Sequence, residues 1–407
     1  MPTFIKKIHS KKERIETLEK SLSELEIEFQ KVNAAWIKAE QESKEALAQA
    51  EEKLKAAEAE LAKRTKNVRK LETTVKKMQK DKRLADKKRK YLPIVMRETG
   101  WDLDTAEAKM ERALDVVGAS YEHYAIFRFW ELTEDEQKTY FTKRDAVTLR
   151  RKYNTNKELV KTLMNKDSCC TLLEPFLGRP WMSTKNMTFE RFQEKFGNEK
   201  KIIYKPTASS GGHGVQVMEL SPETLEDVYN QISAKPEGVV EGYLIQHPEM
   251  KKLSLNSVNT IRVVTINTCQ DVPGIEKNKV NFIYAGMRMG QGSSYVDNLH
   301  SGGMMAAVDI ETGKVVTGGV DHTNVMHDIH PDTKVPIKGF QIPLFDEVKD
   351  LIVRASTDIP GYFGWDIAIT ETGPVIVEVN TSPGADGLQT PFVPQKKGMR
   401  YVIEKYL

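Results

Sequence analysis

Residues 364–384 read GWDIAITETGPVIVEVNTSPG, and this stretch decides the fold of the carboxyl-terminal part of the chain. Two β-rich runs flank TETGP, so we predict a hairpin whose turn centres near Thr372. In that register Asp366 lies opposite Glu378, and Asn380 shares the face of Glu378 because side chains alternate along a strand. Hard oxygen donors of this kind suit Mg²⁺. The alternative is three polar side chains on a purely structural strand pair.

A second segment, residues 202–215, reads IIYKPTASSGGHGV. A strand ending in Lys205 runs into a loop of small residues, where glycines let backbone N–H groups approach a phosphate closely. A lysine facing that loop would hold a polyphosphate. The loop lacks the Lys-Ser/Thr ending of a P-loop and no helix follows it, so an ordinary hairpin loop is the alternative. The small residues of this loop are Ser209, Ser210, Gly211, Gly212 and Gly214.

A third segment, residues 238–248, reads GVVEGYLIQHP. An apolar strand carries one acid, Glu241, into a connecting segment. An adenine edge needs a carboxylate or carbonyl for N6 and a backbone N–H for N1, and this segment offers both. On its own, the segment is more typical of a glutamate on an edge strand than of an adenine contact.

The three segments, in this order, resemble the ATP-grasp superfamily over roughly residues 160–395. More narrowly, QHPEMKKLS, VNTIRVVT, the VDN-then-GG run at 296–303 and GWDIAIT are similar to the sugar-transfer-associated ATP-grasp group, which is related to alpha-L-glutamate ligases. The resemblance implies an α+β fold whose two subdomains enclose ATP and Mg²⁺. It also implies a carboxylate–amine ligase that acts through an acyl phosphate. That group is predicted to act in making cell-surface polysaccharides.

The resemblance assigns roles in nucleotide binding. Lys166 and Lys205 would reach the phosphates, beneath a mobile flap formed by residues 209–214. The adenine hinge would run from Glu241 through Tyr243 to Leu244, with Gln246 or His247 near the ribose. The ribose-binding acid common in the superfamily falls at Pro248 or Glu249, which is a departure from the pattern.

The resemblance also assigns roles in the reaction. Arg262 and Arg288 are similar to the arginines that bind the transferring phosphate and the acyl phosphate. One or two Mg²⁺ ions would be held by Asp366, Glu378 and Asn380. The acceptor would contact Asp297, Asn298 and Ser301, unless the connection that carries them is simply a flexible loop.

Competing functions remain open at this point. Some ATP-grasp proteins are kinases, so phosphotransfer to a hydroxyl is one alternative. A coiled-coil scaffold with a nucleotide-sensing site is another. Acyl-phosphate chemistry needs no covalent nucleophile, and we therefore predict that Cys169 and Cys170 are buried as small apolar residues.

The first ninety residues follow a different pattern. No Pro or Gly lies between Pro2 and Pro93, and the apolar residues step by three and four, so we predict a coiled-coil rod on the order of 110 Å long. The seam shifts phase at residues 39, 43 and 47, which is a stutter. We expect homo-oligomerisation through this seam, with a solvated single helix as the alternative. The basic run KKMQKDKRLADKKRK could contact an acidic membrane surface or polymer, although few apolar residues accompany it.

Charge separates the chain into two parts. Over all 407 residues, 61 Lys and Arg face 58 Asp and Glu, a balance that argues against a dedicated nucleic-acid binder. Residues 1–92 carry a net charge of +9 and residues 93–407 a net charge of −6. Three cysteines, no apolar run as long as a membrane span and no signal-peptide pattern favour a cytoplasmic protein.

We therefore predict four segments. They are a coiled coil at 1–92, a helical segment at 93–165, a small ATP-grasp subdomain at 166–250 and a carboxyl-terminal subdomain at 251–407. Within the helical segment, Thr133 and Glu136 predict a capped helix start. After residue 200, eight β-rich runs alternate with helical stretches near 222–233 and 344–357, which indicates an α+β core.

Overall fold

The computed structural model describes residues 2–42, 44–207, 214–254, 256–272, 274–292, 297, 302–321, 323–384 and 389–407. The chain divides into two compact units, Met1–Pro93 and Ile94–Leu407. Each unit is described below by itself.

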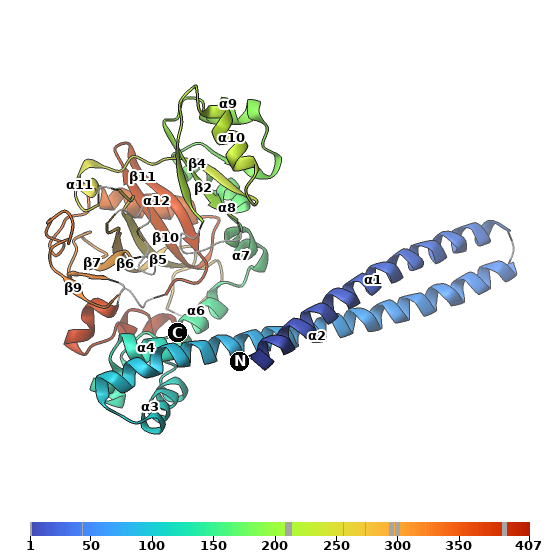
Figure 1. The fold of residues 1–407 in the computed structure, drawn as a ribbon, viewed down its shortest axis with the longest axis horizontal. Coiled ribbons are helices and arrows are strands. Elements are labelled where there is room, and N and C mark those ends of the chain that lie inside the picture. The colour runs from blue at the N-terminus through green and yellow to red at the C-terminus, as the bar shows by residue number, and fades with distance from the viewer. Residues whose placement is uncertain are drawn as a thin grey trace. The chain divides into compact units, whose positions relative to one another are not determined.

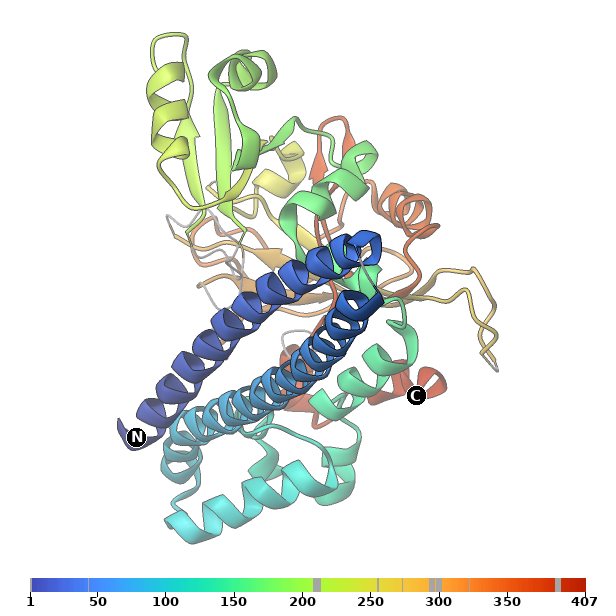
Figure 2. The same cartoon turned by 90° about the vertical axis from the view of Figure 1, so that its right-hand side faces the viewer.

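The first unit is a helical hairpin and not the single rod that the heptad pattern suggested. Helix α1 spans Pro2–Glu42 and helix α2 spans Lys44–Thr99, and the two run antiparallel along one another (Figures 1 and 2). Arg64 Nη1 of α2 donates to the carbonyl oxygen of Ser21 in α1 at 3.4 Å. Val68 and Val75 of α2 are buried. The change of direction therefore falls between α1 and α2, within the phase shift of the seam.

The phase shift explains why one continuous rod is wrong. An apolar stripe that changes phase cannot face one straight partner along its whole length. Folding back lets each half of the seam bury its apolar side chains against the other. The partner is already attached, so no association entropy is lost.

We expect a pair of cysteines at positions 21 and 64 to cross-link within one chain. In a Cys269→Ser background, which removes the exposed native thiol, Ser21→Cys/Arg64→Cys should react with a short bismaleimide to give a species that migrates as a monomer. Denaturing gel electrophoresis over a hundredfold range of protein concentration measures this. A cross-linked dimer whose yield rises with concentration would instead support pairing of the seam between chains.

Helices open the second unit. Thr133 caps α5 in a capping box, in which Glu136 N donates to Thr133 Oγ1 at 3.3 Å and Thr133 N donates to Glu136 Oε2 at 2.7 Å, as predicted. Aromatic side chains pack among these helices, with the rings of Phe127 and Tyr140 5.0 Å apart. The helices are α3 (Leu103–Val116), α4 (Tyr121–Ile126), α5 (Glu134–Lys138), α6 (Lys143–Tyr153), α7 (Lys157–Met164) and α8 (Lys166–Leu173).

A four-stranded antiparallel sheet follows, in the order β1-β4-β2-β3. Phe192 and Phe196 of α9 (Phe189–Phe196) and Val228 and Ile232 of α10 (Leu225–Ser233) pack on the buried side chains of the sheet. Figure 1 shows both helices beside β2 and β4. The strands are β1 (Trp181–Ser183), β2 (Lys201–Pro206), β3 (Gln216–Glu219) and β4 (Gly238–Gly242).

A seven-stranded sheet forms the rest of the unit, in the order β11-β10-β5-β6-β7-β8-β9, and every neighbouring pair is antiparallel. Strand β10 is buried along its whole length, and α12 (Phe345–Ser356) packs on the apolar core of the sheet. The strands are β5 (Thr260–Asn267), β6 (Asn281–Met289), β7 (Met304–Val308), β8 (Gly319–Asp321), β9 (Met326–His327), β10 (Gly361–Thr370) and β11 (Gly373–Asn380).

All eight predicted β-rich runs are strands, whereas the short strands β1, β8 and β9 were not predicted. The α+β class predicted from the alternation of strands and helices is confirmed, because helices pack on each of the two antiparallel sheets. Helix α11 (Pro248–Lys251) and short 3₁₀ helices complete the unit. The 3₁₀ helices lie at Phe129–Glu131, Glu174–Phe176, Thr184–Asn186, Thr390–Gln395, Arg400–Val402 and Glu404–Tyr406.

Candidate functional site

The hairpin of β10 and β11 brings the three predicted oxygen-bearing side chains together. Asp366 pairs directly with Glu378, and Asn380 Nδ2 donates to Asp366 Oδ2 at 3.2 Å and to Glu378 Oε1 at 3.1 Å. The turn contains only Glu371 and Thr372, and a shift of register follows Asp366. The predicted register is therefore right at the site, because the bulge compensates for a turn that is half a residue nearer the amino terminus than expected.

Two arginines hold Asp366 from neighbouring strands. Arg262 of β5 donates to Asp366 from both Nε and Nη2, the latter at 2.9 Å, and Arg288 Nη2 of β6 donates to Asp366 Oδ2 at 2.9 Å. Asp366 is completely buried. Burial alone would raise the pKa of this carboxyl, but the two guanidinium groups lower it to about 2. Asp366 is therefore an ionised carboxylate with both oxygens bonded.

Glu378 has the opposite character. Solvent reaches its side chain, although protein surrounds it on most sides. Loss of hydration and the neighbouring Asp366 carboxylate raise the pKa of Glu378, in that order. A carboxylate that faces a second carboxylate across a strand pair is favoured when a cation lies beside it. Glu378 therefore has a raised pKa, whereas the pKa of Asp366 is lowered.

A second cluster of charges lies on the four-stranded sheet. Glu241 of β4 is 3% exposed, and its Oε2 accepts from Lys205 Nζ at 2.8 Å and from Arg179 Nε at 2.6 Å. Burial would raise the pKa of Glu241, but Arg179 and Lys205 lower it to about 2. Arg179 Nη1 also donates to the carbonyl oxygens of Leu177 and Ile376, at 2.8 and 2.9 Å. Arg179 thereby joins β4 of the smaller sheet to β11 of the larger one.

We expect Glu241 to make the fold sensitive to acid. Its folded-state pKa lies below its ordinary value of 4.5, so its contribution is fully present above pH 4.5 and is lost as the pH falls towards 2. The size of that contribution is on the order of 3 kcal/mol. Chemical denaturation at pH 5.5 and pH 3 should show a smaller loss of stability for Glu241→Gln than for the unmodified chain. Equal losses would contradict the assignment.

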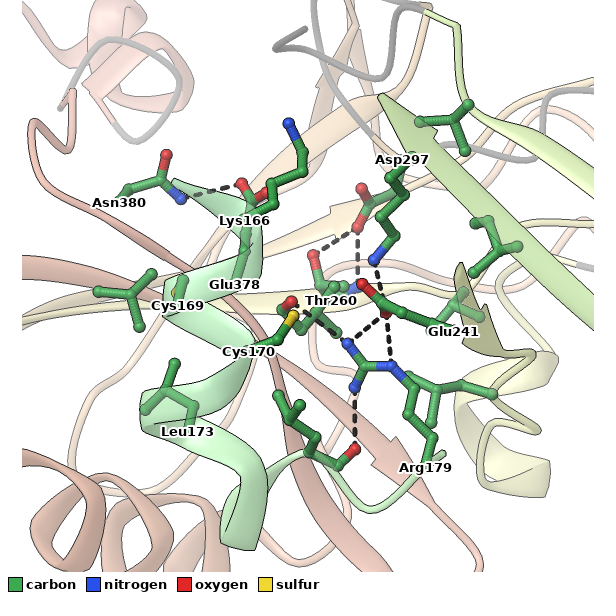
Figure 3. Close-up of a pocket in the computed structure, with 18 of the residues that line it drawn as sticks. Lys166, Cys169, Cys170, Leu173, Arg179, Glu241, Thr260, Asp297, Glu378 and Asn380 are labelled. Atoms are coloured by element: carbon green, nitrogen blue, oxygen red, sulfur yellow. Dashed lines mark hydrogen bonds and ion pairs between the residues drawn. The ribbon is translucent and has the colours of Figure 1, made fainter. Parts of the chain in front are cut away.

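Residues of both charge clusters line one cavity of about 460 Å³ within the second unit, although Asp366 itself, a predicted metal ligand, is not part of the lining. Figure 3 shows Lys166, at the start of α8, beside Glu378 and Asn380, and Arg179 on the opposite wall with Glu241. Burial lowers the pKa of Lys166. Of the residues predicted for the site, the cavity is lined by Lys166, Lys205, Glu241, Tyr243, Leu244, Arg262, Arg288, Asp297, Glu378 and Asn380.

Asp297 was predicted to contact the acceptor. It lines the cavity, but both of its carboxylate oxygens contact other residues of the protein. Its Oδ2 accepts from Thr260 N at 2.9 Å and from Thr260 Oγ1 at 2.5 Å, and its Oδ1 lies 3.5 Å from Arg288 Nη2. Thr260 Oγ1 in turn accepts from Arg288 Nε at 2.9 Å. These contacts fix the orientation of Arg288.

Two predicted ribose contacts lie away from the cavity lining. Gln246 is buried and donates to the carbonyl oxygens of Ser254 and Ser257, so it holds a connecting segment. His247 begins α11, and its Nδ1 accepts from Glu249 N at 3.2 Å. Gly214 has a φ of +76°, which favours glycine. The predicted flap residues Ser209, Ser210, Gly211 and Gly212 and the predicted acceptor contacts Asn298 and Ser301 lie outside the described residues.

The structure adds residues that the sequence patterns did not identify. Arg179 and Thr260 are the main ones, and Cys169 and Cys170 also line the cavity. Both thiols are buried, as predicted, and burial raises their pKa values to about 11 and about 12. Neither is poised as a nucleophile. Arg179 follows Gly178, between the 3₁₀ helix Glu174–Phe176 and β1, and that position alone could not have shown which acid it meets.

A family model described as sugar-transfer associated ATP-grasp matches residues 138–405. That match spans well over half of the chain, and the chain belongs to the sugar-transfer associated ATP-grasp family. The two-sheet α+β arrangement is accordingly an ATP-grasp fold, as the sequence motifs predicted. No curated protein matches the chain.

Solved structures with a similar fold are distant in sequence. N5-carboxyaminoimidazole synthetase from Staphylococcus aureus with ADP is 13% identical, with 56% of this chain and 47% of that chain covered and a TM-score of 0.35. The ATP-grasp ligase PsnB with a minimal precursor is 17% identical, with 62% of each covered and a TM-score of 0.35. D-alanine–D-alanine ligase from Bacillus anthracis is 12% identical, with 64% and 73% covered and a TM-score of 0.37. The chain thus spans less than two thirds of the first two.

Proposed function

We propose that the protein is an ATP-dependent carboxylate–amine ligase that acts through an acyl phosphate. The observation that carries this proposal is the cavity itself. It gathers two lysines, Lys166 and Lys205, two arginines, Arg262 and Arg288, and the exposed carboxylate of Glu378. Cations on several walls around the exposed carboxylate of Glu378 suit a polyphosphate and a reacting carboxylate better than they suit a neutral ligand.

Nucleotide binding would use the wall formed by α8 and the smaller sheet. Lys166 and Lys205 would pair with the phosphates, beneath the flap proposed at residues 209–214. Tyr243 and Leu244, which line the cavity just after β4, would face the base. Glu241 already accepts from Arg179 and Lys205, so we assign it to positioning Lys205 as well as to the base.

The donor set fits Mg²⁺ in a specific way. Glu378 offers carboxylate oxygens and Asn380 an amide oxygen at the cavity, and Mg²⁺ usually takes water and substrate phosphates as its remaining ligands. Glu378 and Asn380 would hold the ion directly. Asp366 would join them when Arg262 and Arg288 turn from it to phosphate oxygens. When bound, Mg²⁺ neutralises charge on the β- and γ-phosphates.

The residues then serve a simple chemical sequence. The substrate carboxylate takes the γ-phosphoryl group from ATP and ADP leaves, and the resulting acyl phosphate has a good leaving group. An amine attacks the acyl carbon, inorganic phosphate leaves, the amine nitrogen loses a proton and an amide forms. Arg262 and Arg288 stabilise the charge on the transferring group, and Asp297 and Thr260 keep Arg288 in place. Closure of the flap excludes water that would hydrolyse the acyl phosphate.

The family description supports a setting in sugar transfer, and we propose a precursor of a cell-surface polysaccharide or peptide as the substrate, modified in the cytoplasm. A uronic acid with an amino acid, or a peptide with an amino acid, fits the reaction. We also propose a helical segment at 93–165, followed by two ATP-grasp subdomains at 166–250 and 251–407. Among the described residues, no helix is long and apolar enough to cross a membrane.

Hydroxylamine trapping tests the reaction. With Mg·ATP and pools of uronic acids, peptides or amino acids, a ligase yields ADP and a hydroxamate, which mass spectrometry identifies. The kinase alternative yields ADP and a phosphorylated alcohol without hydroxamate. ADP release that depends on none of these carboxylates would favour the nucleotide-sensing scaffold.

A further inference from the structure

The helical hairpin concentrates positive charge at one end. Residues 2–14 carry five basic and one acidic side chain, and residues 76–90 carry nine basic and two acidic ones. The contact between Arg64 and Ser21 sets an antiparallel register that brings these two segments to the same end of the hairpin. Their combined net charge is +11, whereas residues 15–75 between them carry a net charge of −2. Neither segment alone predicts this concentration.

On α2 the basic side chains form a stripe. They recur at steps of four and three residues, so they share one face of the helix over about 21 Å. Four of the five are exposed and Lys87 is half-buried. The stripe consists of Lys76, Lys80, Arg83, Lys87 and Lys90.

An exposed apolar residue lies beside this stripe. Leu84 is 41% exposed, although it belongs to the most charged part of the helix. Lysines stand four and seven residues before it and three and four residues after it, which places all of them around it on the helix surface. They are Lys77, Lys80, Lys87 and Lys88.

We propose that this end of the hairpin docks on the surface of an anionic phospholipid bilayer. Clusters of four to eight basic residues on a helix are attracted to anionic lipid headgroups. An apolar side chain among them reaches the boundary between headgroups and acyl chains, while the long lysine side chains keep their charges at the headgroups. A polymer with a phosphate backbone, such as DNA, would interact with the basic side chains but would not provide an apolar region for Leu84. The docking is peripheral and sensitive to salt.

Co-sedimentation of the full chain with sucrose-loaded vesicles tests the proposal. Vesicles of phosphatidylcholine alone are compared with vesicles of 70% phosphatidylcholine and 30% phosphatidylglycerol, at 50 mM and 300 mM NaCl. We expect binding to the anionic vesicles at low salt, and at least tenfold weaker binding at high salt or on neutral vesicles. Single-stranded DNA at the same two salt concentrations serves as the competing polyanion.

Matched variants distinguish an effect of the stripe on vesicle binding from an effect of the net charge of the chain. Lys76→Gln/Lys80→Gln/Arg83→Gln should weaken vesicle binding at least tenfold. Its control removes three equally exposed lysines from residues 15–75, at positions 20, 31 and 53, and should change binding less than twofold. Leu84→Ser should weaken vesicle binding by about threefold or more without affecting DNA binding. Far-ultraviolet circular dichroism confirms that the helices of each variant are intact.

Three results would overturn the proposal. One is failure to bind anionic vesicles at 50 mM NaCl. Another is an equal effect of the stripe variant and its charge-matched control. The third is tighter binding to DNA than to vesicles with no effect of Leu84→Ser, which would identify a general polyanion site.

Discussion

Glu378→Gln is expected to lower Mg·ATP-dependent turnover by about 10²- to 10³-fold while leaving the fold intact. The substitution keeps the shape of the side chain and removes the carboxylate of β11 that solvent reaches and that forms no ion pair with an arginine among the described residues. ADP release measures turnover, and calorimetry of ADP binding with and without Mg²⁺ measures the metal-dependent part of the affinity. We expect that part to disappear.

Stability separates this role from a structural one. Because the pKa of Glu378 is raised in the folded chain, its contribution to stability is present at low pH and is lost as the pH rises through that pKa. At pH 7 glutamine should therefore leave the free energy of unfolding unchanged or raise it. Glu371→Gln, in the exposed turn of the same hairpin, is the matched control and should be active. Retained turnover in Glu378→Gln would remove it from the proposed metal site.

The hairpin shows what local patterning can predict. The position of TETGP between two β-rich runs placed the centre of the turn near Thr372, and that centre predicted the pairing of Asp366 with Glu378. The bulge that follows Asp366 could not be read from the sequence. It arises because the short turn of two residues sets one register, whereas contacts with distant parts of the chain set another further along the strands.

The amino-terminal helices show where patterning stops. A heptad seam specifies that an apolar face needs a partner, but not whether that partner is another chain or the same one. The phase shift at residues 39–47 contained the missing information, since it marks where the seam cannot continue straight. The turn of the hairpin falls there.

Ion pairs between distant segments were the least predictable part of the site. Arg179 and Glu241 are 62 residues apart, and Arg262 and Asp366 are 104 residues apart. Propensity and periodicity describe neighbours along the chain, so they cannot show which acid a given arginine meets. Glu241 therefore looked like a contact for adenine, although most of its bonding serves Arg179 and Lys205.

Arg179→Met is expected to cost about 3–5 kcal/mol of folding free energy, because it leaves a buried carboxylate with one cation in place of two. Methionine keeps much of the arginine volume, so the loss reports charge and hydrogen bonds more than packing. Arg112→Met is the matched control. It breaks an Arg–Glu pair of similar length, 2.7 Å to Glu134, but the two side chains are 67% and 38% exposed, against 3% and 4% for Arg179 and Glu241. Exposed pairs contribute about 0–1 kcal/mol.

We expect Arg179→Met to weaken Mg²⁺-dependent ADP binding as well as stability, and the two effects have different causes. Arg179 Nη1 holds the carbonyl oxygen of Ile376, two residues before Glu378, so its loss should also loosen the bulge that aims Glu378 into the cavity. Chemical denaturation measures the first effect, and Mg²⁺-dependent ADP binding, at a temperature where the variant is folded, measures the second. We expect affinity to fall about tenfold or more, as for the loss of a residue that orients a metal ligand. If the folded variant bound Mg·ADP normally, Arg179 would stabilise the two sheets without positioning Glu378.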